Sequence, residues 1–255
     1  MIVYSAAAAC AVAVVIAASR LPRRVRGTID DPDPDGPTTS RSGAMLSALF
    51  LLAFAIAIVV PWTSADAARS NTYAESQAIS EASWAAARPP APDARDVQRG
   101  LREYADFVRR SEWTVMKDGR LDPRGWRRLD DLRRRVIAVE ADTEELKEAR
   151  EALLTHLGEI AAARRQRAMD ARIIPPAGLY AVTVLTGAAV ILLPFMAGAR
   201  PRGMTLVPLS LMAALLAAGT YLTLDIAHVF DGAMAVGPEA FTETQAELRR
   251  IAGGG

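Results

Sequence analysis

Four long apolar segments, two on each side of a charged middle, constrain this fold more than any other feature. They are Met1 to Ser19, Met45 to Val60, Ala177 to Ala197 and Met204 to Leu224, and none contains Asp, Glu, Lys or Arg. A helix of about 20 apolar residues crosses the hydrocarbon of a bilayer. The sequence therefore predicts a multi-pass, all-α protein of a cell membrane, with four transmembrane helices in two pairs.

The first apolar segment has alternative interpretations. A signal peptide carries its positive charge before the apolar core, whereas here Arg20, Arg23 and Arg24 follow it. The residues before Cys10 weakly resemble a lipoprotein cleavage site, but they lack the aliphatic residue usual three positions earlier. We therefore expect a retained first helix, with Cys10 as a small packing residue inside it.

The remaining chain divides by composition. Prolines alternate with aspartates in the loop 20–43, which excludes regular structure there. Apolar residues at three- and four-residue steps in the charged middle predict amphipathic helices in an antiparallel bundle or set of hairpins. The predicted parts are a first membrane pair in 1–63 (helices about 2–19 and 44–62), a helical extramembrane domain in 64–175, a second membrane pair in 176–231 (helices about 177–197 and 204–226) and a short amphipathic helix with its tail in 232–255.

Helix boundaries in the middle are marked by specific residues. The second membrane helix is expected to continue past Trp62 until Pro89-Pro90 stops it, and Asp93 is expected to cap the next helix. That next helix carries a stripe of Val97, Leu101, Tyr104, Val108 and Val115. Asp122-Pro123 predicts a further helix start, and Thr143 followed by two glutamates predicts the last one.

Composition excludes several kinds of chemistry. One cysteine rules out an internal disulfide, and with only two histidines a metal centre is not expected. No nucleophile, Gly-rich phosphate loop or other catalytic pattern stands out, so we expect no enzyme and no cofactor. The net charge of +1 conceals strong segregation of charge into the middle, so it argues neither for nor against nucleic acid. We expect no nucleic-acid partner.

Two aromatic residues in the second membrane helix are the candidates for a pore. Phe50 and Phe54 lie four residues apart, and rings at that spacing can form a hydrophobic constriction. The commoner alternative is that both rings pack against neighbouring helices or lipid.

One carboxylate in the middle domain requires a partner. Glu112 lies on the apolar side of its helix, four residues after Val108, and a buried carboxylate needs a cation. We expect Arg164 or Arg165 to supply it in a structural ion pair.

A polar trio follows the fourth apolar segment. Asp225, His228 and Asp231 recur at three-residue steps and share one helical face. Such residues can hold a cation, but the spacing is generic, and we interpret them as a polar cluster at the membrane edge.

Several stretches resemble a bacterial family of bestrophin-like membrane proteins. The domain that defines this family has no known function. The resemblance is carried by Ala48 to Trp62 with Ala68-Arg69 and Glu75, by Leu101 to Val108 with Glu112-Trp113 and Met116, by Arg164 to Arg167, by Leu224 to Gly232, and by Val236 with Pro238 to Phe241. Pro61 and the Asp/Pro-rich loop depart from the family pattern. The family name implies a distant likeness to bestrophins, which are pentameric anion channels with a pore lined by the second membrane helix.

Two functions follow from these features. The first is an oligomeric ion channel, as the resemblance implies. The alternative is a helical interaction or scaffold protein, anchored at the cell envelope by two membrane hairpins and without transport activity. Both have the lipid bilayer as a partner and favour a homo-oligomer, because a middle domain of this length buries only a modest core alone.

Arginines in the short loops predict the orientation. Arg20, Arg23 and Arg24 follow the first helix, and Arg200 and Arg202 lie between the last two. Short loops rich in Arg stay in the cytoplasm, which puts the middle domain outside it. The arginines of 164–172 and the likeness to bestrophins favour the opposite orientation.

Overall fold

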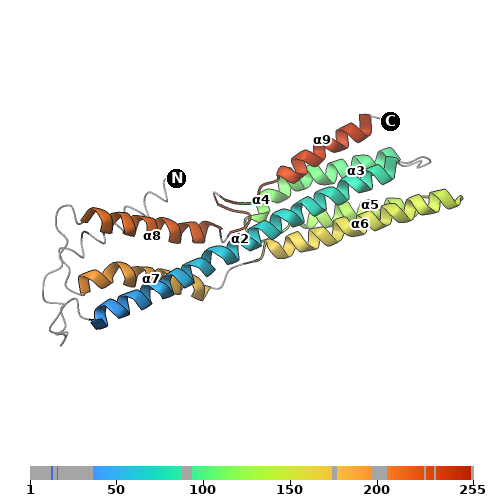
Figure 1. Cartoon of the computed structure of the whole chain (residues 1–255). Coiled ribbons are helices and arrows are strands. Elements are labelled where there is room, and N and C mark those ends of the chain that lie inside the picture. The colour runs from blue at the N-terminus through green and yellow to red at the C-terminus, as the bar shows by residue number, and fades with distance from the viewer. Residues whose placement is uncertain are drawn as a thin grey trace. The chain divides into compact units, whose positions relative to one another are not determined.

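A computed structural model describes residues 37–87, 94–173, 177–196, 206–226, 228–232 and 234–253, together with Ala13 and Ile16. Every regular element in these ranges is helical, so the all-α class is confirmed (Figure 1). The expected first membrane helix lies almost wholly outside the described residues, as do loop residues 20–36, the prolines at 89–90 and the cap at Asp93.

The elements follow one another as nine helical segments within the described ranges. They are α2 (Pro37–Ala87), α3 (Ala94–Phe107), the π-helix η2 (Val108–Glu112), α4 (Trp113–Met116), α5 (Pro123–Ala138), α6 (Glu144–Asp170), α7 (Ala177–Met196), α8 (Leu206–Ile226) and α9 (Glu239–Gly253).

Local signals explain most of the boundaries. The Asp122 side chain accepts a hydrogen bond from the Arg124 N–H with Pro123 at the first helical position, and Thr143 caps α6 through the Leu146 N–H. Gly119, at φ 70°, lies in the turn after α4. One boundary was wrong: α2 begins at Pro37, so residues 37–43, expected in a loop, are helical because proline is favoured in the first turn of a helix.

The chain divides into two compact units. Unit 1 comprises Met1–Trp62 and Pro175–Ala227, and unit 2 comprises Thr63–Ile174 and His228–Gly255. Helix α2 contributes to both units, and unit 2 is assembled from two stretches of chain that α7 and α8 separate.

Unit 1 contains α7, α8 and the first part of α2. Within the described ranges one helix, over Ser47–Ala87, is long and apolar enough to cross a membrane by length and composition. The apolar stretches of α7 and α8, Ala181–Leu192 and Ser210–Ile226, fall short of that length. Among the described residues the structure therefore shows one candidate span, and the other three expected from the sequence are not shown.

Unit 2 is a bundle around α2, α3, α5, α6 and α9. Each of these helices contributes apolar side chains to one core. The core is centred on Ile79, Leu101, Tyr104, Leu132, Leu157, Ile160, Phe241 and Leu248. A smaller cluster joins Ala68, Met116, Val229, Phe230 and Val236.

Candidate functional site: a buried charge network in unit 2

Four charged side chains lie fully inside unit 2. Glu75 comes from α2, Glu112 from η2, and Arg164 and Arg167 from α6, and none of them has accessible surface. Tyr104 of α3 is equally buried beside them. Two carboxylates and two guanidinium groups balance in charge, which is the condition for keeping ionised groups out of water.

Glu112 is the centre of the network. Its two carboxylate oxygens each accept a hydrogen bond from Arg164, from Nη1 and Nη2, both at 2.5 Å. The Arg167 Nη2 donates to the same carboxylate at 3.0 Å. The backbone N–H of Asp122 adds a further bond to Glu112 at 3.0 Å. A two-pronged contact of this kind matches the planar geometry of guanidinium and carboxylate.

Arg167 connects Glu112 to the second carboxylate. It donates to Glu75 from Nε at 2.7 Å and from Nη2 at 3.0 Å, and its Nη1 points to the Met116 sulfur at 2.9 Å. The Tyr104 hydroxyl donates to Glu75 at 2.6 Å and accepts from Arg164 Nη1 at 3.4 Å. Hydrogen bonds thus link all five side chains in a closed ring.

Aromatic rings and one glycine shape the surroundings of the arginines. The Arg164 guanidinium lies 5.2 Å from the ring of Trp126, and that of Arg167 lies 5.6 Å from Phe241. A Cβ atom at Gly125 would collide with the Arg164 guanidinium, so α5 can approach α6 this closely only with glycine at that position.

Glu112 is the last residue of the π-helix η2. The Trp113 N–H bonds to the Val108 carbonyl, five residues earlier, so one extra residue is accommodated between α3 and α4. The apolar face consequently shifts: Met116 is buried, whereas Val115, expected in the stripe, is only half-buried. The prediction for Val115 was wrong because it assumed an uninterrupted α-helical period.

The network raises the pKa of both arginines and of the tyrosine. Burial alone lowers the pKa of Arg167, but the charges of Glu75 and Glu112 outweigh it and raise this pKa above its usual value. Arg164 likewise keeps a raised pKa, because its bonds to Glu112 outweigh burial. Burial first, and then the Glu75 charge, raise the pKa of Tyr104 well above its usual value. The raised pKa values keep Arg164, Arg167 and Tyr104 in their protonated forms.

A family model identified as the bestrophin-like domain matches residues 6–241. The chain belongs to the bestrophin-like family. No curated protein and no solved structure matches the chain.

The buried network unites the stretches that carry the bestrophin-like resemblance. Glu75 comes from the first of those stretches, Tyr104 and Glu112 from the second, and Arg164 from the third, and all four meet in the ring of hydrogen bonds. Phe241, from the last of those stretches, lies over Arg167. In this bestrophin-like protein part of the recognisable pattern therefore builds the core of unit 2.

The hydrogen bonds of Glu112 identify Arg164 as its partner. The structure brings Glu112 and Arg164 together, whereas Arg165 is exposed and lies 6.0 Å from the Trp126 ring instead. Sequence reasoning did not identify Glu75, Tyr104 and Arg167 as members of the buried charge network. The spacing of the arginines could have revealed Arg167, because it follows Arg164 by three residues and shares its helix face.

The two candidate pore residues pack inside unit 1. The rings of Phe50 and Phe54 stack with their centroids 5.4 Å apart, and only 4% of Phe50 is exposed. Phe50 contacts Gly187 of α7, and Phe54 contacts Gly219 of α8. These contacts favour packing between helices over a constriction facing a pore.

The polar trio does not share one helical face as expected, because α8 ends at Ile226, before His228 and Asp231. Asp225 lies in the last turn of α8 and belongs to unit 1, whereas His228 and Asp231 follow it in unit 2. Over the described ranges, no group of three His, Cys, Asp or Glu side chains is placed to hold a metal ion.

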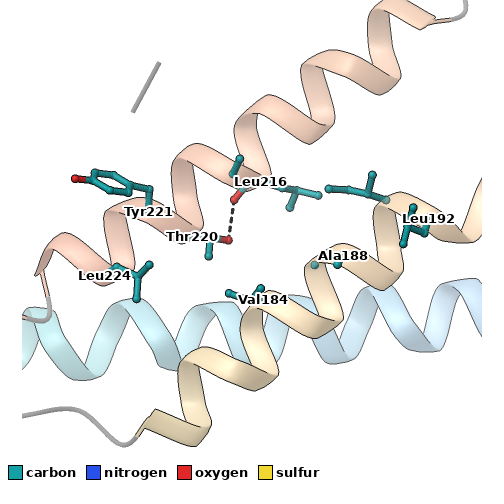
Figure 2. Close-up of a pocket in the computed structure, with 10 residues that line it drawn as sticks. Val184, Ala188, Leu192, Leu216, Thr220, Tyr221 and Leu224 are labelled. Atoms are coloured by element: carbon teal, nitrogen blue, oxygen red, sulfur yellow. Dashed lines mark hydrogen bonds between the residues drawn. The ribbon is translucent and has the colours of Figure 1, made fainter. Parts of the chain in front are cut away.

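An apolar groove runs between α7 and α8 (Figure 2). Its volume is about 340 Å³. Figure 2 shows Val184, Ala188 and Leu192 on one side and Leu216, Thr220 and Leu224 on the other. The Thr220 hydroxyl donates to the Leu216 carbonyl at 2.8 Å, which satisfies it within its own helix.

Proposed function

We propose that this bestrophin-like protein is a membrane-anchored scaffold, in which unit 1 lies in the bilayer and unit 2 is a rigid helical bundle that binds a partner outside it. The observation that carries the proposal is the apolar surface of α2. More than half of the side-chain surface is exposed at Leu49, Leu51, Leu52 and Val59. Exposed apolar residues of this kind are stable against lipid and costly against water.

The interior of unit 2 supports a scaffold more than a catalyst. Its buried ionisable ring is closed to solvent, and each charge is paired within the ring. A substrate cannot reach these groups without unfolding of the bundle. Such a core fixes the relative positions of its helices, and a partner then meets a surface of constant shape.

Family membership favours a second candidate, an oligomeric anion channel. Bestrophin likeness implies a ring of subunits around one axis, with pore walls from several copies of α2. We do not retain Phe50 and Phe54 as its constriction, because their contacts to Gly187 and Gly219 occupy both rings within one chain. Any pore lining would come from other side chains of α2.

The deciding experiment combines subunit number with ion flux. The full-length protein is extracted into lipid discs for mass determination and reconstituted into liposomes loaded with chloride. The scaffold proposal expects flux equal to that of empty liposomes, whatever the mass. Chloride flux that rises with the amount of protein, together with a ring of about five subunits, would overturn it in favour of the channel.

We further propose that unit 2 lies outside the cytoplasm, as the arginines at 20–26 and 200–202 indicate. The test is a Ser70→Cys variant in a Cys10→Ala background, since Ser70 is exposed in unit 2. A membrane-impermeant maleimide added to intact cells should label this cysteine. Labelling only after the cells are broken would reverse the orientation.

A further inference from the structure

The outer face of α5 concentrates positive charge. One side of this helix, with Leu129, Leu132 and Val136, is buried in unit 2. Exposed arginines recur on the other side at steps of three, four and seven residues, and these steps place them on one helix face. We call this surface the arginine face, and its members are Arg124, Arg127, Arg128, Arg134 and Arg135. Asp131 lies among them and pairs with Arg134.

Two further arginines of this face are oriented by neighbouring side chains. Arg124 donates to Asp122 from Nε at 2.9 Å and from Nη2 at 2.6 Å. Arg128 approaches Glu103 at 4.0 Å. Both guanidinium groups also lie over the Phe107 ring, at 5.3 and 4.9 Å from its centroid. A ring contact occupies the flat side of a guanidinium group, so its N–H edge remains able to bind an oxygen.

The remaining two members, Arg127 and Arg135, are not neutralised. Among the described residues no carboxylate pairs with either of them. They are eight residues apart, which is about 12 Å along the helix. Like charges three or four residues apart destabilise a helix, so their concentration in a chain of net charge +1 points to a partner that neutralises them.

We propose that the arginine face of α5 binds an acidic segment of a partner protein, whose carboxylates pair with Arg127 and Arg135. Asp131, in the middle of the face, favours a protein over a phosphate polymer. A continuous row of phosphates, as in nucleic acid or a lipid surface, would be repelled by this aspartate, whereas a protein segment can place its carboxylates on either side of it.

This inference rests on the proposed scaffold function, because it gives the chemistry of the scaffold's partner. The two can fail separately. Chloride flux would overturn the scaffold whether or not an acidic segment binds, and loss of that binding would leave the flux of the liposomes unchanged.

Binding of poly-L-glutamate tests the proposal. The full-length protein is placed in phosphatidylcholine discs, and a fluorescein-labelled poly-L-glutamate peptide is titrated at low salt, where exposed ion pairs are least screened. Fluorescence anisotropy reports the Kd. Unlabelled poly-L-glutamate and inorganic polyphosphate of the same charge then compete with the labelled peptide.

Two double variants separate the arginine face from net charge. Arg127→Gln with Arg135→Gln removes the two unpaired members of the face. The matched control is Arg249→Gln with Arg250→Gln, which removes the same charge from exposed positions on α9 of the same unit. Urea unfolding of both variants shows that each remains folded.

We expect the Kd of the first variant to rise about fivefold, the loss that removal of two solvent-exposed ion pairs produces, and that of the control to rise less than about twofold. Equal weakening in both variants, or no binding by the unaltered protein, would refute the arginine face as a binding site. Polyphosphate that displaces the peptide at a lower concentration than unlabelled poly-L-glutamate would assign the face to a phosphate polymer and overturn the acidic protein partner.

Discussion

At the scale of single residues, Glu112 is the member on which the network depends most. It accepts hydrogen bonds from Arg164, Arg167 and the Asp122 backbone. Replacing one partner of a buried ion pair leaves the other charge uncompensated, which costs about 3–5 kcal/mol. We therefore expect Glu112→Gln to lower the free energy of unfolding of unit 2 by about 3 kcal/mol, measured by urea unfolding and the fluorescence of Trp113 and Trp126.

An exposed ion pair provides the control for that variant. Arg134 and Asp131 pair three residues apart on the outer face of α5, where 71% of the arginine side chain is exposed. Arg134→Gln should change stability by less than about 1 kcal/mol, because solvent screens such pairs. If both variants unfold at the same urea concentration, the buried pair does not stabilise the bundle.

Tyr104 makes the stability of unit 2 sensitive to alkaline pH. Its pKa is raised in the folded bundle, so the fold favours the neutral phenol, whereas the unfolded chain ionises near pH 10. The contribution of Tyr104 to the free energy of unfolding is complete below about pH 10. It is lost as the pH rises from there towards the pKa of Tyr104 in the folded protein, by up to about 1.4 kcal/mol per pH unit.

The matched variant for this prediction is Tyr104→Phe. It keeps the ring but removes the hydroxyl that donates to Glu75, so it should cost about 1–3 kcal/mol at neutral pH. Above pH 10 its unfolding curve should depend less on pH than that of the unaltered protein. Identical pH profiles would show that Tyr104 ionises normally in the fold.

At the scale of elements, the π-helix η2 determines which residue of the following turn enters the core. Only 1% of Met116 is exposed, whereas Val115 is half-buried. Truncating a buried methionine costs about 2–5 kcal/mol. Met116→Ala should therefore destabilise unit 2 by at least 2 kcal/mol and Val115→Ala by less than about 1 kcal/mol in the same urea assay. The reverse order would mean that the helix runs on with an α-helical period.

The same element shows how far sequence reasoning extends. Caps at Asp122 and Thr143 were predictable because capping depends on a few neighbouring residues. The pairing of Glu112 with a cation was predictable because a carboxylate on an apolar face must be compensated. The single-residue shift at Val108–Glu112 was not, since Glu112 bonds to Arg164 and Arg167 of α6, which lie far along the chain.

Glu75 and Arg167 were missed for a related reason. Glu75 lies in a stretch of α2 rich in Ala and Ser, where burial on several sides leaves no clear amphipathic stripe. Arg167 belongs to a run of arginines in which composition does not distinguish the buried side chain from the exposed Arg165. Only the contacts between α2 and α6 in the folded structure identify Glu75 and Arg167 as buried partners.

At the scale of the whole molecule, the C-terminal helix completes a bundle begun far earlier in the chain. Phe241 and Leu248 of α9 lie in the core of unit 2, and Ser76 of α2 contacts Thr244 through their hydroxyl groups. The Gln245 side chain donates to the Arg102 carbonyl of α3 at 2.9 Å. A fragment that ends before α7 therefore lacks part of its own core.

This assembly changes what a fragment experiment can reveal about subunit contacts. Residues 64–172 expressed alone would expose the apolar surface that α9 covers, so their self-association would not demonstrate a natural interface. We expect this fragment to aggregate or unfold, and to become a stable monomer when residues 228–255 are supplied as a separate peptide. Phe241→Ala in that peptide should weaken binding by at least tenfold, because it removes a fully buried ring. Binding unaffected by Phe241→Ala would show that α9 does not close the bundle, whereas a dimer that persists with the unaltered peptide bound would identify a true subunit interface on the outer faces of unit 2.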